Sequence, residues 1–529
     1  MRKKVLLITP PYHAGVVESA GRWPNLGFVY IAGHLRAAGF EVEIYDAMTR
    51  GDDLESVGKL LADHRPHYVG TSAITASYPA ALEVLRLAKG LNPRVITLLG
   101  GVHPTMMYTQ VLEENPGVVD FVIRGEGEVT TVELLQALES GSPLDGVLGM
   151  AYLERTEGSH RRRASQALEG VPGIARLDKG CTEGAESRQV DVSAGQVVAT
   201  APRPFIQDLD SLLPAWDLVN WSDYTLFVRP GSRLGIVSSS RGCVNACRFC
   251  SQQKFWHRSY RQRSPESFVQ ELEHLRDSYG VTVVMLSDEY PTRDRQRWER
   301  ILHLLSERRV GMDLLLETCV ADILRDADIL ERYHQAGVRH IYVGVEATSN
   351  QRLEIFQKDI KCEESREALR LINEAGIITE CSFVLGLPDE TPERIAETLA
   401  LAKYYDPDFA HFLHLAPWPY ADLYQEVRGF IVEEDYSKYN FVEPILQPEA
   451  MALAEMKQTI IDCYREFYLD KARSYRAGPD GFKKEYFFRS LQVMLKNSFL
   501  KKHLAGLGKM PREVETLLAP LPVKGVDDG

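Results

Sequence analysis

The first 145 residues alternate between short apolar runs and longer segments with one apolar side. The runs are continuously apolar, which is typical of strands buried on both faces of a parallel sheet. Between the first two runs, residues 26–38 have the spacing of an amphipathic helix, and Gly39 follows as a stop signal. The pattern predicts a doubly wound α/β domain. Its expected strands are 4–9, 40–45, 68–72, 95–99 and 121–123, and a second helix is expected over 78–91.

Small and hydroxylic residues follow these predicted strands. Ser72 and Thr75 come after one strand, Gly100 and Gly101 come after the next, and Gly-Glu-Gly-Glu at 125–128 follows the last. Ligands of such sheets bind beyond the carboxyl ends of the strands, and glycines let a ligand approach the backbone. The pattern therefore indicates a ligand site, although tight turns of any α/β domain have a similar composition.

Residues 146–229 connect this domain to the next. Residues 147–153 and 196–201 predict two strands of a hairpin, and the polar stretch between them predicts a disordered insertion that includes the arginines at 161–163. Residues 204–219 are expected to form an ordered linker.

A second alternation of strands and helices begins near residue 230. Six strand-and-helix units predict a partial β/α barrel over 230–424, with its active site at the carboxyl ends of the strands. Ser264 and Pro265 are typical of a helix start, and a further helix is expected over 322–336. The expected strands are 236–240, 283–286, 314–318, 340–344, 382–386 and 409–415.

Residues 425–529 have the amphipathic pattern of helices, for example over 452–469 and 482–503. We expect this region to cover the active site, and a purely structural appendage is the alternative. The complete prediction is an α/β protein with four parts, bounded as 1–145, 146–229, 230–424 and 425–529.

Composition and charge narrow the range of possible functions. The chain has 529 residues, 44% of them hydrophobic, and a formal net charge of −13 with dispersed basic residues. This balance argues against a nucleic-acid partner. No apolar stretch is long enough to span a bilayer, so we expect a cytoplasmic protein without an integral membrane segment. Five cysteines are scattered without paired spacing, which suits a reducing compartment.

The other three cysteines, Cys243, Cys247 and Cys250, form one short loop after a predicted strand. Iron–sulfur clusters are usually held by four cysteines, and no fourth cysteine is close in sequence. Three thiolates would leave one metal position open to a small molecule. A zinc site is the alternative, with His257 as the one nearby candidate for a fourth ligand.

The spacing Cys-x3-Cys-x-aromatic-Cys resembles the signature of the radical S-adenosylmethionine (radical SAM) superfamily. The resemblance implies that the three cysteines hold a 4Fe-4S cluster, that SAM chelates the fourth iron, and that the aromatic residue Phe249 contacts the adenine.

The same resemblance assigns SAM binding to the polar ends of the later barrel strands. It implies that these residues receive the amino group, ribose and adenine of SAM. They are Asp288 and Glu289 after the second strand, Glu317 to Cys319 after the third, Gly344 and Glu346 after the fourth, and Gly386 to Thr391 after the fifth.

The amino-terminal domain resembles the Rossmann-like cobalamin-binding domain that precedes the barrel in many radical SAM enzymes. The resemblance implies that Ser72, Thr75, Gly100 and Gly101 surround the nucleotide tail of cobalamin. The loop after the first strand lacks the Asp-x-His-x-x-Gly motif that supplies an axial histidine. Cobalamin is therefore expected to bind without a histidine from this domain.

Five further stretches, 22–24, 45–49, 251–256, 416–426 and 438–445, resemble the family of anaerobic magnesium-protoporphyrin IX monomethyl ester cyclases. This resemblance implies a planar, apolar porphyrin substrate, oxidative formation of the isocyclic ring of (bacterio)chlorophylls, and an electron donor such as flavodoxin or ferredoxin. Phe255, Trp256, Trp418 and Tyr420 would offer aromatic faces to such a substrate, although each also suits an ordinary core.

Two alternatives stay open at this point. A cobalamin-dependent radical SAM C-methyltransferase, acting on an unactivated carbon, would carry the same cofactor motifs. A non-catalytic protein that keeps a cluster as a redox sensor would share the cysteine loop, but it would not need polar strand ends.

Overall fold

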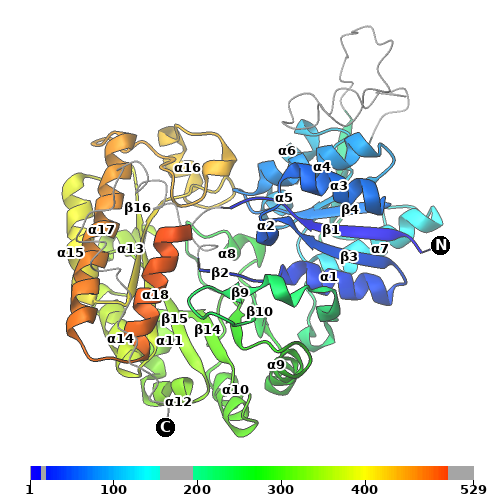
Figure 1. The fold of residues 1–529 in the computed structure, drawn as a ribbon. Helices are drawn as coiled ribbons and strands as arrows, with labels where there is room; N and C mark the ends of the chain where they lie inside the picture. Colours follow the sequence, from blue (N-terminus) through cyan, green and yellow to red (C-terminus); the bar gives the residue numbers. More distant parts are fainter. Residues whose placement is uncertain (1, 14–19, 155–194, 498–529) are drawn as a thin grey trace. The chain divides into compact units, whose positions relative to one another are not determined.

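The structure is a computed structural model that describes residues 2–13, 20–154 and 195–497. These residues form two compact units (Figure 1). The first contains the described residues of 1–13 and 24–220, and the second contains those of 14–23 and 221–529. The predicted insertion, with the arginines at 161–163, lies outside the described residues.

The first unit is built on a seven-stranded sheet in the order β3-β1-β4-β5-β6-β7-β8. Its first five strands are parallel, as the continuous apolar runs predicted. The predicted hairpin is also confirmed, because β7 and β8 pair antiparallel and extend the sheet. The strands are β1 (Lys4–Thr9), β3 (Glu41–Asp46), β4 (Tyr68–Ser72), β5 (Ile96–Gly100), β6 (Phe121–Ile123), β7 (Met150–Glu154) and β8 (Gln196–Ala199).

Helices cover both faces of this sheet, which confirms the doubly wound class. On one face, α1 and α7 pack together over a core that contains Phe28, Leu35 and Leu134. Residues 204–219, expected to be a linker, belong to this unit, because the Ala215 N–H donates to the Val29 carbonyl at 3.0 Å. The helices are α1 (Leu26–Ala37), α2 (Ala47–Arg50), α3 (Leu54–His64), α4 (Tyr78–Leu91), α5 (Val102–Met106), α6 (Tyr108–Glu114) and α7 (Gly127–Ser140).

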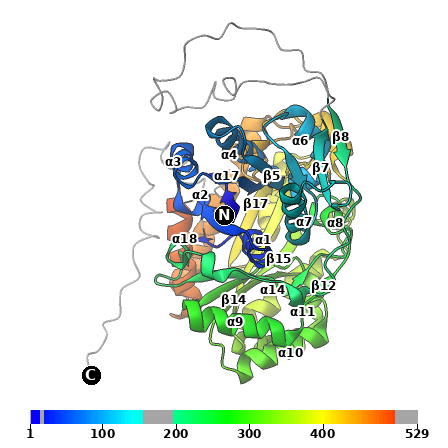
Figure 2. The ribbon, with the colours of Figure 1, turned by 90° about the vertical axis from the view of Figure 1, so that its right-hand side faces the viewer.

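The second unit is built on six parallel strands that follow one another in chain order. Figure 2 shows these strands side by side, with α9, α10, α11 and α14 outside them. The predicted partial (β/α)6 barrel is therefore confirmed. The strands are β10 (Leu234–Val237), β13 (Val283–Leu286), β14 (Asp313–Thr318), β15 (Val338–Glu346), β16 (Ile378–Leu385) and β17 (Phe409–His414).

The barrel helices begin and end where local chemistry requires. Helix α9 starts after Ser264, whose hydroxyl accepts the Ser267 N–H at 3.2 Å, and it ends at Gly280 with φ of 64°. The barrel helices are α8 (Gln252–Phe255), α9 (Pro265–Tyr279), α10 (Arg295–Glu307), α11 (Val320–Arg325), α12 (Leu330–Gln335), α13 (Asn350–Ile355), α14 (Cys362–Glu374) and α15 (Pro392–Tyr405).

The prediction of one continuous helix over 322–336 is wrong, because the structure divides this region into α11 and α12. The carboxylate of Asp326 lies between them and is fully buried. It accepts the Tyr333 hydroxyl at 2.6 Å and the Arg325 guanidinium at 2.7 Å. A buried carboxylate needs such partners, and the chain bends to supply them.

Helix α17 (Leu453–Ala477) closes the free edge of strand β17 (Figure 1). The Tyr464 hydroxyl accepts the Phe412 N–H at 3.1 Å, and the Tyr468 hydroxyl donates to the Ala410 carbonyl at 3.1 Å. These side chains replace the hydrogen bonds that a further strand would make.

Helix α18 (Phe482–Asn497) lies at the amino ends of the strands, which differs from the expected cover over the active site. The Tyr486 hydroxyl is hydrogen-bonded to Nδ1 of His340 at 3.0 Å, and the Lys483 ammonium is 2.8 Å from the Asp408 carboxylate. An amphipathic pattern predicts a helix but not the surface that it covers.

The segment 416–447, which includes α16 (Tyr424–Val427), reaches the carboxyl ends instead. The Leu423 N–H donates to the Arg248 carbonyl at 3.0 Å, and the Gln253 amide donates to Asp422 at 2.9 Å. The cover over the cysteine loop is therefore this irregular segment.

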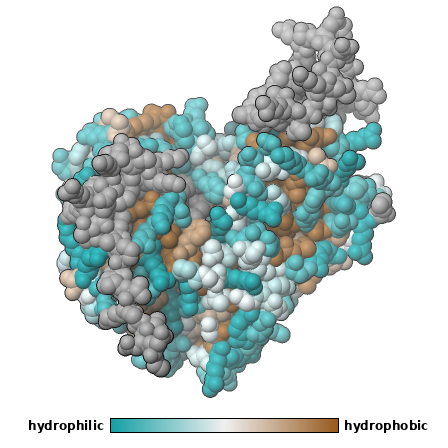
Figure 3. All heavy atoms as spheres, viewed as in Figure 1, coloured by the Kyte–Doolittle hydropathy of each residue, from teal (hydrophilic) through white to brown (hydrophobic). Residues whose placement is uncertain are grey.

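The surface agrees with the expectation from composition. Hydrophilic residues cover most of the face in Figure 3, and apolar residues form scattered patches between them. No helix among the described residues is long and apolar enough to cross a membrane.

Replacing Tyr468 by Phe tests the closure of the β17 edge. The substitution leaves the buried Ala410 carbonyl without its donor, so we expect a loss of about 1–3 kcal/mol in the free energy of unfolding. Urea denaturation followed by circular dichroism measures this loss. Tyr404→Phe is the control, since Tyr404 is 58% exposed. Equal stability of the two variants would contradict the proposed closure.

Candidate functional site

The cysteine loop leaves the barrel after β10 and the short strand β11 (Ser240–Arg241), which pairs antiparallel with β12 (Arg261–Gln262). Gly242 begins the loop with φ of 99°, and a Cβ atom there would overlap the carbonyl oxygen of Ser259. Only glycine fits this position. Its conformation directs Cys243, Cys247 and Cys250 to the carboxyl ends of the strands, where all three are partly exposed.

The three thiols suit an iron–sulfur cluster better than a zinc ion. Burial raises the pKa of Cys243 to about 12 and that of Cys250 to about 11, so thiolates here need a metal cation beside them. A zinc ion requires four ligands converging at about 2.0–2.3 Å. Among the described residues, no group of three or more His, Cys, Asp or Glu converges in this way. Cluster cysteines bind separate irons and need not converge on one point.

Asp288 and Glu289 hold the loop in place from the end of β13. Asp288 is fully buried and accepts the Ser239 N–H at 2.7 Å and the Ser239 and Ser240 hydroxyls at 2.6 Å. Glu289 accepts the Gly242 N–H at 3.0 Å and the Trp256 indole N–H at 2.6 Å. Burial raises the pKa of both carboxyls. Both residues therefore position the loop, and their predicted contact with SAM stays a prediction.

An ion pair lies over Gly344 at the end of β15. The Lys358 ammonium is 3.0 Å from the Glu346 carboxylate. A Cβ atom on Gly344 would be 2.5 Å from Glu346 Oε1 and 2.7 Å from Lys358 Nζ, which explains the glycine. Burial lowers the pKa of Lys358, but Glu346 and the nearby Cys247 and Cys319 thiols outweigh this and hold it above its ordinary value.

Sequence reasoning found Gly344 and Glu346 but missed Lys358. This lysine lies in an irregular loop between α13 and α14, and no motif there marks it. Glu346 itself has φ of 66°, an unusual conformation for a residue with a side chain. The pair places one positive and one negative charge beside the cysteine loop, which suits the zwitterionic methionine part of SAM.

No fourth cysteine is close to the loop in sequence, but Cys319 lies near it in three dimensions. Cys319 follows β14, and the Asn245 amide of the cysteine loop contacts its sulfur at 3.5 Å. The two segments are far apart in sequence, so spacing alone did not reveal this contact.

Four of the five predicted aromatic residues pack against other aromatic side chains. Phe249 lies edge-on to Phe356, with ring centroids 5.1 Å apart. Phe255 packs against the buried Trp256 at 4.7 Å, and Trp418 packs against Phe441 at 5.5 Å. Contact of Phe249 with adenine, and of the others with a planar substrate, stays a prediction.

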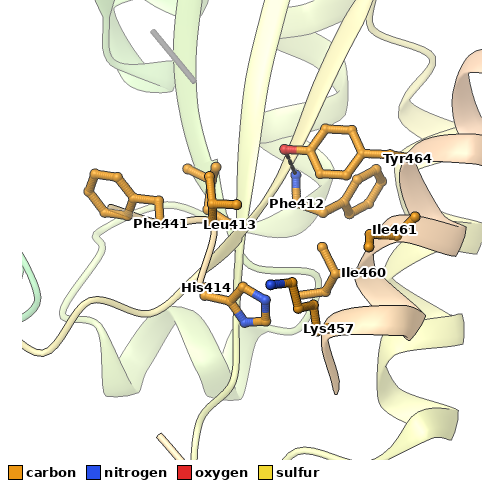
Figure 4. Close-up of a pocket in the computed structure, with 9 residues that line it drawn as sticks. Phe412, Leu413, His414, Phe441, Lys457, Ile460, Ile461 and Tyr464 are labelled. Atoms are coloured by element: carbon orange, nitrogen blue, oxygen red, sulfur yellow. Dashed lines mark hydrogen bonds between the residues drawn. The ribbon is translucent and has the colours of Figure 1, made fainter. Parts of the chain in front are cut away.

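A small pocket of about 10 Å³ lies between the end of β17 and α17 (Figure 4). Its notable residue is His414, which is buried and has no hydrogen-bond partner for Nε2 among the described residues. Burial lowers the pKa of His414 to about 3, so the ring is neutral. Sequence reasoning missed this residue. The pocket lining is Phe412, Leu413, His414, Phe441, Val442, Lys457, Ile460, Ile461 and Tyr464.

The first unit brings its predicted residues together at the carboxyl ends of β4 and β5. Gly101 has φ of 98°, and a Cβ atom there would be 2.8 Å from the Ser72 hydroxyl. Thr75 is buried, and its hydroxyl is 3.2 Å from Nδ1 of His103. Burial lowers the pKa of His103 to about 4, so this histidine is neutral. Part of the glycine and threonine pattern thus serves the packing of the loops.

The same edge nevertheless has features that fit a large ligand. A Cβ atom on Gly125 would meet nothing within 4 Å, so space remains above the backbone. Ile74 is 54% exposed directly after β4. The buried hydroxyls of Thr9 and Thr71, at the ends of the adjacent strands β1 and β4, have no partner among the described residues. Apolar surface and spare hydroxyls suit a cofactor with an apolar ring and a polar tail.

Replacing Cys247 by Ala tests the cluster ligands. We expect anaerobically reconstituted Cys247→Ala to lose its iron, its sulfide and its visible absorption, because two thiolates do not retain the cluster. Cys362→Ala is the matched control, since Cys362 begins α14 outside the loop. Iron retention by Cys247→Ala at the level of this control would contradict the assignment.

Replacing Gly344 by Ala tests the ion pair. The added methyl group must displace Glu346 or Lys358, and we expect the affinity for SAM to fall about tenfold or more. Equilibrium dialysis of the reconstituted protein with labelled SAM measures this. Gly146→Ala is the control, because a Cβ atom there meets nothing within 4 Å. Equal affinities of the two variants would show that SAM does not need the pair.

Comparisons with known proteins divide the chain in the same way. A B12 binding domain model matches residues 12–135, and a radical SAM superfamily model matches residues 237–402. The solved radical SAM methyltransferase TsrM from Kitasatospora setae, with cobalamin and a [4Fe-4S] cluster bound, has a TM-score of 0.63 at 17% identity. The match covers 96% of this chain and 100% of TsrM, and it shows a shared fold.

The two domains confirm the predicted cofactors, which are cobalamin, SAM and a 4Fe-4S cluster. The protein is a radical SAM enzyme.

Curated relatives match across both units. The anaerobic magnesium-protoporphyrin IX monomethyl ester cyclase of Rubrivivax gelatinosus is 35% identical, over 94% of this chain and 83% of the relative. The cyclase of Cereibacter sphaeroides is also 35% identical, over 93% and 75%. An uncharacterized methyltransferase of Pyrococcus horikoshii is 27% identical, over 88% and 92%. By the extent and level of the first two matches, the chain belongs to the family of the anaerobic magnesium-protoporphyrin IX monomethyl ester cyclases.

Proposed function

We propose that the protein catalyses the oxidative cyclisation of magnesium-protoporphyrin IX monomethyl ester without molecular oxygen. The product would carry the isocyclic ring of protochlorophyllide. One observation carries the proposal, namely the 35% identity to the Rubrivivax gelatinosus cyclase over 94% of the chain. It covers both units and so extends beyond the cofactor motifs.

In this proposal, different residues of the site bind different cofactors. Cys243, Cys247 and Cys250 would hold the cluster, and the Glu346–Lys358 pair would hold the methionine part of SAM. When bound, these cofactors supply the radical chemistry that removes hydrogen from the 13-propionate methyl ester side chain. The chain positions them and limits the access of water.

Cobalamin would bind at the carboxyl edge of the first unit. Ser72, Gly100 and Gly101 lie there, with the unpaired Thr9 and Thr71 hydroxyls and the exposed Ile74. Thr75 would act through the loop that it and His103 stabilise, because its hydroxyl is already hydrogen-bonded.

The porphyrin and an electron donor are the partners that this function requires. The paired aromatic rings at the carboxyl ends of the barrel, among them Trp418 and Phe441, suit a flat macrocycle. A flavodoxin or ferredoxin would supply the electron that reduces the cluster.

A cobalamin-dependent C-methyltransferase is the second candidate. The match to the Pyrococcus horikoshii methyltransferase over 88% of this chain favours it. Both activities use the same two domains, so only the product distinguishes them.

Anaerobic incubation of the reconstituted protein with reductant, SAM, cobalamin and magnesium-protoporphyrin IX monomethyl ester tests the proposal. Mass spectrometry should find a porphyrin product that has gained oxygen from water and lost hydrogen, and Cys247→Ala should form none. A product heavier by one methylene group would establish the methyltransferase instead. SAM cleavage with unchanged porphyrin would refute this substrate, and a cluster stable in air would count against the oxygen-sensitive chemistry.

A further inference from the structure

The barrel lumen contains a carboxylate without a partner, that of Glu317. Along β14, Leu314, Leu316 and Thr318 are buried, whereas Leu315 and Glu317 alternate with them. Side chains of a β/α barrel strand alternate between the helices and the lumen, so Leu315 and Glu317 face the lumen. The Glu317 side chain lies within the barrel, is accessible from the open lumen, and has no hydrogen bond or ion pair among the described residues.

The lumen below Glu317 is partly filled by apolar side chains. Leu315, one step lower on β14, packs against the same apolar cluster as Met285 and Tyr486 of α18. Leu315 also lines an open pocket at the amino ends of the strands, together with Asp313 and Arg339. Glu317 lies further along β14, nearer the carboxyl end of the strand.

The lumen above Glu317 leads to the cysteine loop. Cys319 follows β14 directly, and its sulfur contacts Asn245 of the loop. Two residues along a strand span about 7 Å, so Glu317 lies one layer below the loop. This is the space where a substrate would meet the radical chemistry.

The neighbouring carboxylates have partners that Glu317 lacks. Glu346 pairs with Lys358, and Asp288 and Glu289 accept hydrogen bonds from the loop. Glu380 is 2.7 Å from Nε2 of His340 and is also hydrogen-bonded to Nε2 of His411.

Glu317 is a carboxyl whose pKa lies near neutral pH. Burial opposes the charge of Glu380, but the imidazoles of His340 and His411 outweigh it and lower the pKa of Glu380. Burial within the barrel, followed by the charges of Glu289, Glu346 and Glu380, raises the pKa of Glu317 to about 7. Other titratable groups near Glu317 are Asp288 after β13, Cys319 just after β14, and Tyr342 on β15. Lys358, His340 and His411 contact the neighbouring carboxylates Glu346 and Glu380.

We propose that Glu317 is the general base that accepts a proton from the water or from the substrate carbon reacting in the barrel lumen. This inference rests on the proposed function. In the oxygen-inserting step, the substrate would have lost a hydrogen atom to the 5′-deoxyadenosyl radical and one electron to bound cobalamin, which would serve as the one-electron oxidant. A water oxygen forms the new C–O bond to the resulting cation, the O–H bond breaks, and the Glu317 carboxylate takes the proton. The open lumen then returns the proton to solvent.

Glu317→Gln separates this role from SAM cleavage. Three proteins, namely Glu317→Gln, Glu317→Asp and wild type, are reconstituted and supplied with substrate deuterated on the 13-propionate side chain. We expect Glu317→Gln to form deuterated 5′-deoxyadenosine within about twofold of wild type, while oxygenated product falls about 100-fold or more. Glu317→Asp should retain part of the product formation. Product formation by wild type should rise with pH to a plateau above about pH 7, and that of Glu317→Gln should be independent of pH.

Glu307→Gln is the matched control, because the Glu307 side chain is 58% exposed at the end of α10. Product formation by Glu317→Gln equal to that of this control overturns the inference. A parallel loss of 5′-deoxyadenosine also overturns it, since Glu317 would then belong to the SAM site. Absence of deuterium transfer in wild type refutes the proposed function, and the inference then depends on the stability measurement below.

The stability of the reconstituted protein tests the environment of Glu317 without turnover. Its raised pKa means that the folded protein binds this proton more tightly than the unfolded chain, so stability falls as pH rises from the ordinary value towards 7. Glu317→Gln removes this loss of stability, because a glutamine side chain does not ionise. It should unfold at a higher urea concentration than wild type at about pH 8, and the difference should vanish at about pH 4–5. No difference at pH 8, as expected for Glu307→Gln, overturns the inference.

Discussion

One buried carboxylate determines how the cysteine loop leaves the barrel. Asp288 accepts three hydrogen bonds from Ser239 and Ser240, the residues that connect β10 to the loop. A buried charge without such partners would cost several kcal/mol, so the strand end has little freedom. The Arg297 guanidinium donates to the Ser239 carbonyl at 2.6 Å and holds the same turn from helix α10. The position of the thiols therefore depends on a network that contacts none of them.

Several carboxylates lie in the lumen next to this network, and some of them are paired with a lysine or with histidines. Lys358 neutralises Glu346, and two histidines surround Glu380. Fixed pairs of this kind hold their protons over a wide pH range and serve mainly to position groups. Glu317 differs because no residue that the structure describes pairs with its charge. A site that must both fix a cationic cofactor and move protons needs both kinds of carboxylate.

Much of the fold was predictable because buried parallel strands leave a strong signal. The predicted ranges 68–72, 121–123 and 283–286 coincide with β4, β6 and β13, each an apolar run bounded by polar residues. The break between α11 and α12 was not predictable, because it depends on the partners of Asp326. The position of α18 also depends on tertiary contacts, since its apolar side matches more than one surface.

The candidate site was predictable where one short segment carries the chemistry. The cysteine loop is such a segment. Lys358, Cys319 and His414 were missed or misplaced, because their significance comes from side chains that are distant in sequence. Glu317 was noted as one of several polar strand ends. Only the structure shows that its neighbours have partners and that it has none.

The tyrosines of α17 have a consequence for the protein in solution. An uncovered edge strand is a template on which other chains can add strands and aggregate. Helix α17 occupies this edge with Tyr464 and Tyr468, although it follows the barrel in sequence. During synthesis the barrel strands emerge first, so the β17 edge stays open until the helix has been made. The carboxyl-terminal region thus protects the completed barrel from self-association, whereas the nascent barrel lacks this protection until α17 has formed.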